Sequence, residues 1–175
     1  EQNTKVDPKS LMNCFGILPD PGADYKVTVY VQEPAAGLPF NYGPNSVGHT
    51  AIGLTKTVNG QSITQVLGLY PDATGKAKLH APSNILDNAG LNYNVSATYD
   101  VQGFEFRTIA TFISNPPATY DLYNYNCTNF VYDALKSGNI TLPNPIGNMG
   151  MFQNGMTPAA LGSSLRDAAS ILNAN

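Results

Sequence analysis

Alternating apolar and polar positions predict three β-strands in the first half of the chain. Residues 25–31 alternate β-branched and aromatic side chains, and two further alternating segments, 47–58 and 61–70, flank Asn59 and Gly60. An Asn-Gly pair is the strongest short-range signal for a two-residue type I′ turn. The sequence therefore predicts an antiparallel hairpin whose two strands are joined at this turn.

The turn also fixes which residues of the hairpin share a face. When Val58 pairs with Gln61, His49 lies opposite Tyr70, and side chains alternate between the two faces of each strand. One face then holds large aliphatic side chains, which are Ile52, Leu54, Val58, Ile63, Leu67 and Leu69. The other face holds His49 together with Ala51, Gly53, Thr55, Thr64, Val66 and Gly68. Small side chains let a helix approach closely, so we expect a helix to pack on the face of His49.

The segment after the hairpin is rich in loop-forming residues and predicts a long connection over residues 71–94. We expect a short helical turn at residues 83–88 within this connection. Residues 95–101 return to a strand pattern.

A helical spacing of apolar residues then begins and predicts three helices. The first covers residues 104–114 and is stopped by two prolines. The second runs from Asn126, which can cap its start, to Gly138, which can end it. The third covers residues 157–173, with a threonine cap followed by a proline at the first helical position. Strands and helices together indicate an α+β fold with a small antiparallel sheet and a cysteine-bearing helix packed on one face.

Length and composition limit the possible classes of protein. The chain of 175 residues fits one domain, in which residues 1–24 form an N-terminal arm, 46–138 the core and 157–173 a C-terminal helix. Charged residues are 12% and the net charge is −3, so we expect no nucleic-acid partner. No apolar run approaches the roughly 20 residues of a membrane-spanning helix. Few charges among many uncharged polar residues favour a secreted, periplasmic or cell-surface protein, and no motif specifies an oligomeric state.

The candidate chemistry depends on Cys127 and the two histidines. Cys127 falls in the first turn of a predicted helix, where unpaired N–H groups stabilise a thiolate. His49 is a candidate base for it, and Tyr70 or Asp72 is a candidate to orient the imidazole. His80 lies in a polar loop and is expected to be exposed. Two histidines and two cysteines without clustered spacing predict neither a metal site nor a cofactor.

Two interpretations in which Cys127 has no catalytic role also remain open from the sequence. The residue lies on the apolar stripe of its helix, as buried free cysteines commonly do. It also has one potential disulfide partner, Cys14, if the protein occupies an oxidising compartment.

Two segments resemble a known family, the circularly permuted papain-like cysteine hydrolases, which include NlpC-like peptidases and lecithin:retinol acyltransferase-like enzymes. The segments are Gly48-His49-Thr50-Ala51-Ile52-Gly53-Leu54 and, much later, Tyr125-Asn126-Cys127-Thr128-Asn129-Phe130. The resemblance covers residues 46–138 and implies a permuted papain-like fold. It makes Cys127 the nucleophile and His49 the base. The third position falls on Tyr70, where the family usually has His, Asn or another plainly polar residue.

The resemblance implies a thiol hydrolase of the peptidase or amidase type. By analogy it points to a peptide or a peptidoglycan-type cell-wall peptide as the substrate class, and the family also includes acyltransferases that act on lipids. The alternative is a non-catalytic exported binding domain on the same fold. It would hold a peptide or a glycan along the aromatic residues of segment 120–126. The unusual Tyr70 at the third position points to this alternative.

Overall fold

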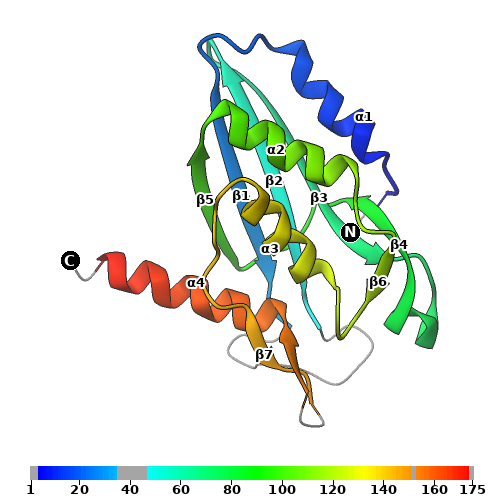
Figure 1. The fold of residues 1–175 in the computed structure, drawn as a ribbon. Coiled ribbons are helices and arrows are strands. Elements are labelled where there is room, and N and C mark those ends of the chain that lie inside the picture. Colours follow the sequence, from blue (N-terminus) through cyan, green and yellow to red (C-terminus); the bar gives the residue numbers. More distant parts are fainter. Residues whose placement is uncertain (1–3, 35–46, 151–152, 174–175) are drawn as a thin grey trace.

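A six-stranded antiparallel sheet forms the centre of the computed structural model, which describes residues 4–34, 47–150 and 153–173 (Figure 1). The strand order is β5-β1-β2-β3-β4-β6, and a separate two-stranded sheet is formed by β7 and β8. The strands are β1 (Asp24–Gln32), β2 (His49–Val58), β3 (Gln61–Pro71), β4 (His80–Asp87), β5 (Val95–Val101), β6 (Thr119–Asp121), β7 (Ile146–Asn148) and β8 (Asn154–Met156). The helices are α1 (Pro8–Asn13), α2 (Gly103–Ser114), α3 (Cys127–Ser137) and α4 (Pro158–Asn173), with short 3₁₀ turns at Cys14–Ile17 and Gly75–Leu79.

The predicted hairpin between β2 and β3 is confirmed. Val58 pairs with Gln61, and the ladder continues in the expected register to Ile52 opposite Leu67. The turn residue Asn59 has a φ of 51° and the glycine after it a φ of 78°. A type I′ turn needs positive φ at both central residues, so the local turn chemistry sets the pairing of the whole hairpin.

The expected packing of the cysteine helix is wrong. The apolar stripe of α3 joins the same buried cluster as the large aliphatic residues of β2 and β3, rather than covering the small residues. The hydroxyls of Thr50 and Thr128, 2.9 Å apart in the interior, mark the contact of β2 with the first turn of α3. Burial of two large apolar surfaces against each other removes more area from water than a small-residue fit would. This larger burial of apolar area explains why α3 packs on the face that holds the large aliphatic residues.

The small residues on the opposite face make room for polar and aromatic side chains. A side chain at Gly53 would collide with the ring of Tyr30, and one at Gly68 would overlap His49 and Asn88. The face of His49 is therefore a place where individual side chains approach the backbone of the sheet.

Several short strands in the structure are not anticipated by the sequence pattern. The segment expected to contain a helical turn forms β4, which pairs along β3, with Leu69 opposite Ile85. Short strands of three residues, β6, β7 and β8, occur where only loops were expected. β6 is stabilised by pairing with β4, and β7 and β8 by pairing with each other, so local propensity is a weak guide to these strands.

The predicted helix caps and the strands β1 and β5 are confirmed. Asn126 caps α3, and Thr157 accepts a hydrogen bond from the N–H of Ala160 at the start of α4. The buried ammonium of Lys56, on β2, donates to the carbonyls of Phe15 and Leu18, which lie in the N-terminal arm. Among the described residues, no helix is long and apolar enough to cross a membrane.

Candidate active site around Cys127

Cys127 is the first residue of α3, and its position is set by the cap residue before it. The side-chain oxygen of Asn126 accepts hydrogen bonds from the N–H groups of Thr128 and Asn129. Its amide nitrogen donates to the carbonyls of Leu122 and Met156, at 2.9 and 2.8 Å. One buried side chain thus ties the cysteine helix to the turn before it and to β8.

The thiol of Cys127 is surrounded by hydrogen-bond donors. Burial raises the pKa of the Cys127 thiol, because it disfavours the thiolate. Hydrogen bonds from the N–H groups of Thr50, Thr128 and Cys127 itself, and from the Thr128 hydroxyl, act in the opposite direction. The thiol is therefore neutral at rest, while the donors that would stabilise an anion are already in place.

The imidazole of His49 contacts Asn88 and Tyr70. Its Nε2 lies 2.9 Å from Oδ1 of Asn88, and its ring stacks on that of Tyr70 at a centroid distance of 4.3 Å. The amide nitrogen of Asn88 donates to the Tyr70 hydroxyl at 2.7 Å and to the carbonyl of Asp87 at 3.3 Å. A carbonyl can only accept, so the amide oxygen faces the imidazole. Nε2 therefore carries the proton that Asn88 accepts, which places the basic lone pair on Nδ1.

Asn88 is the residue that sequence reasoning missed. It follows β4, is almost fully buried, and is the hydrogen-bond partner of His49. Tyr70 lies beside the imidazole as its register predicts, but it contacts the ring face and the Asn88 amide. The carboxylate of Asp72 lies 3.6 Å from the ammonium of Lys5. The sequence holds one signal for Asn88, which is its residue type. Asparagine is among the residues that usually occupy the third position in the family that the two segments resemble.

The thiol and the imidazole approach the same end of β2 from two sides. The Thr50 side chain points toward α3, so the His49 side chain, one position earlier, points to the opposite face of the sheet. The Cys127 sulfur lies within hydrogen-bonding reach of the Thr50 N–H and is therefore beside the strand itself. The structure brings the thiol next to the residue that follows His49, at the end of the sheet.

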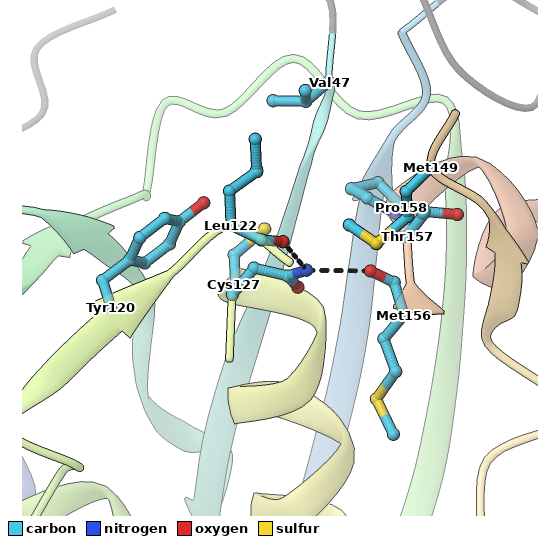
Figure 2. A pocket seen from close by; sticks show the side chains of 9 residues that line it. Val47, Tyr120, Leu122, Cys127, Met149, Met156, Thr157 and Pro158 are labelled. Atoms are coloured by element: carbon cyan, nitrogen blue, oxygen red, sulfur yellow. Dashed lines mark hydrogen bonds between the residues drawn. The ribbon is translucent and has the colours of Figure 1, made fainter. Parts of the chain in front are cut away.

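A small apolar pocket opens beside the thiol. Figure 2 shows Cys127 with Tyr120 and Leu122 on one side and with Met149, Met156, Thr157 and Pro158 on the other. Val47, two residues before His49, closes the pocket toward the start of β2. The cavity itself is small, about 10 Å³, which is room for about one water molecule, and it opens to solvent.

The remaining predicted residues lie outside this site. Both cysteines are free, so the disulfide interpretation is wrong. The thiol of Cys14 donates to the carbonyl of Ser10. His80 is exposed, as expected, and its Nδ1 lies 2.9 Å from the carboxylate of Asp121. That contact lowers the pKa of the Asp121 carboxyl. In the described part of the chain, no group of histidine, cysteine and acidic side chains is arranged to hold a metal ion.

Comparison of the chain with family models, with curated proteins and with solved structures gave no match. The resemblance to papain-like hydrolases therefore depends on the two sequence segments quoted above. The contacts around Cys127, His49 and Asn88 are the structural observations that bear on it.

Proposed function

We propose that the chain is a cysteine hydrolase that cleaves an amide bond, with Cys127 as nucleophile and His49 as general base. The observation that carries the proposal is that the helix-start thiol lies beside Thr50, the residue that follows His49, and that the His49 imidazole has a fixed tautomer. Asn88 has the positioning role, because it accepts the Nε2 proton and leaves Nδ1 basic. Tyr70 supports that role by stacking on the ring and binding the Asn88 amide.

In the proposed reaction, the sulfur attacks the carbonyl carbon of the substrate as Nδ1 of His49 takes the thiol proton. The oxygen of the tetrahedral intermediate is stabilised by backbone N–H groups at the start of α3 and β2. The intermediate then breaks its C–N bond, and the amine leaves with the proton from His49. Water, deprotonated by His49, releases the acid from the thioester and restores the thiol.

For these steps the imidazole must reach the thiol around the end of β2, because the two side chains approach that strand end from opposite faces of the sheet. Hydrogen bonds between catalytic groups are often long in a site without substrate and shorten in the substrate complex. A peptide or cell-wall peptide substrate and an exported location remain predictions from the family resemblance and the composition.

The first experiment measures the alkylation of Cys127 by iodoacetamide at pH 7 in a Cys14→Ser background. We expect His49→Ala to slow alkylation at least tenfold, because the base is lost. His80→Ala removes an exposed histidine and serves as the matched control, with no change expected. Asn88→Ala should give an intermediate rate. Equal rates in the parent and His49→Ala proteins, both folded by circular dichroism, would refute the dyad.

The second experiment follows the turnover of p-nitrophenyl acetate, which reports formation and hydrolysis of an acyl-enzyme. General-base catalysis typically contributes roughly 10²–10⁴-fold, so His49→Ala should lose turnover by about that factor. Cys127→Ser should lose it as well. Turnover that rises when a primary amine or alcohol is added identifies an acyltransferase instead.

The second candidate function is a non-catalytic binding domain that places a ligand in the pocket of Cys127. The burial of the thiol and its raised pKa favour this candidate. It predicts a thiol that iodoacetamide modifies slowly and at a rate independent of His49. The alkylation experiment therefore separates the two functions.

A further inference from the structure

We propose that the outer edge of β5 is an interface at which a second copy of this chain adds its own β5 in antiparallel orientation. The two six-stranded sheets then continue as one sheet across a twofold axis. Figure 1 shows β5 at one edge of the sheet, beside β1. This edge lies apart from Cys127 and His49, so the inference does not depend on the proposed hydrolase.

The chain covers the two edges of its sheet differently. At the β4 edge, residues 80–82 pair with β6, and Lys5 of the N-terminal arm forms a bridge to Leu86. At the β5 edge, none of the described strands pairs with the outer side, and no described residue bonds to the outward-facing backbone groups. A row of unpaired N–H and C=O groups is a template for another strand.

β5 also lacks the features that usually prevent pairing at a sheet edge. Its sequence, VSATYDV, contains neither lysine nor proline. Its pairing with β1 is continuous from Val95 to Val101, so no bulge interrupts the strand. Its one charged side chain, Asp100, accepts a hydrogen bond from the ammonium of Lys26 at 2.6 Å. The edge is therefore regular and nearly uncharged.

The hydrophobic core is incompletely covered along this edge. Four apolar side chains of β5 pack on the core but stay only half-buried: Val95, Ala97, Tyr99 and Val101. Their partners on β1 are buried, and these are Val31, Val29, Val27 and Tyr25. A further strand beside β5 covers this row as β5 covers the row on β1. Burial of apolar area favours the addition.

The sequence of β5 favours a second copy as the added strand. Residues opposite each other in an antiparallel pair point to the same face, and a register centred on Thr98 pairs the strand over its whole length. In that register small side chains oppose larger ones, a hydroxyl opposes the carboxylate, and no like charges meet. The pairs, each formed twice, are Val95 with Val101, Ser96 with Asp100, and Ala97 with Tyr99. Such self-complementarity is what a twofold interface requires.

The size of the contact sets the expected strength. Specific interfaces bury about 1,200–2,000 Å² in total, and a single pair of strands lies at or below the low end of that range. We therefore expect a dimer that dissociates in the micromolar range of concentration. Sedimentation velocity of the full chain, from low micromolar to submillimolar concentration, measures its dissociation constant.

Two charged variants at the twofold axis identify the strand. Thr98→Lys places two ammonium groups opposite each other, and Thr98→Glu places two carboxylates there. Each should raise the dissociation constant at least about tenfold. An equimolar mixture of the two variants should dimerise again, because opposite charges then face each other across the axis. A merely unfolded variant would not show this rescue.

The matched control is Thr64→Lys, on the same face of the sheet but in the interior strand β3. The Thr64 hydroxyl lies 2.8 Å from that of Thr55, just as the Thr98 hydroxyl lies 3.0 Å from that of Thr28. The control therefore loses an equivalent cross-strand contact and should leave the dissociation constant unchanged. Amide hydrogen exchange gives a second measurement. Protection of β5 should rise with concentration in the parent protein and not in Thr98→Lys.

Three results would overturn the inference. A chain that stays monomeric at every concentration has no self-interface, and the edge is then left for a strand of a different protein. A dimer that both charged variants retain uses another surface. Charged variants that fail to dimerise when mixed contradict the register centred on Thr98. None of these results bears on alkylation of Cys127, so the proposed hydrolase stands or fails separately.

Discussion

The absence of a side chain at residue 68 gives the sharpest test of the site. In Gly68→Ala, the new methyl group would overlap Nε2 of His49 and Oδ1 of Asn88 and would lie 3.0 Å from Cε1 of His49. Both atoms of the hydrogen bond that fixes the imidazole tautomer would have to move. Overpacking of this kind costs about 1–3 kcal/mol, and the lost hydrogen bond adds about 1 kcal/mol.

The free energy of unfolding should therefore fall by about 2–4 kcal/mol, which corresponds to a Tm lower by roughly 4–16 °C. Alkylation of Cys127 should slow with it, because the imidazole is displaced. The control is Gly16→Ala, since a methyl group there meets no atom within 4 Å, and its effect should stay within about 0.5 kcal/mol. A Gly68→Ala protein with unchanged stability and unchanged alkylation would refute the geometry of His49 and Asn88.

Two further predictions concern the thiol and its cap. Because burial raises the pKa of the Cys127 thiol, the unfolded chain ionises first as the pH rises. Stability should therefore fall above about pH 8.5, by up to about 1.4 kcal/mol per pH unit. Urea titrations at pH 8.5 and 9.5 measure this slope, and Cys127→Ser should reduce it; an equal slope in both proteins contradicts the burial. Asn126→Asp keeps the acceptor of the cap but loses both donors to Leu122 and Met156. Two carbonyls left unpaired should cost about 1–3 kcal/mol each at most, seen as a lower Tm, whereas Asn154→Asp at an exposed position should change little.

The parts of the fold that the sequence predicts are those set by neighbouring residues. The Asn59-Gly60 turn determines the register of β2 and β3, and Asn126 and Thr157 determine where two helices begin. Each of these signals acts over a few residues, so it needs no knowledge of the rest of the chain. The same is true of the thiol at the start of α3.

The parts that could not be predicted depend on contacts between distant segments. The face covered by α3 is decided by the total apolar area of several elements, which one hairpin does not reveal. Asn88 reaches His49 only because β4 pairs with β3, and that pairing has no strong local signal. The pocket wall likewise combines residues of β6, β8 and the start of α4.

The order of the strands predicts which parts of the molecule unfold locally most easily. β2 is paired on both sides, by β1 and β3, whereas β7 and β8 form a ladder of their own. Amide hydrogen exchange should therefore be slowest in the segment that presents the imidazole and faster in the hairpin that contributes the methionines. Substitutions in that hairpin should therefore have little effect on the stability of the strand that carries His49.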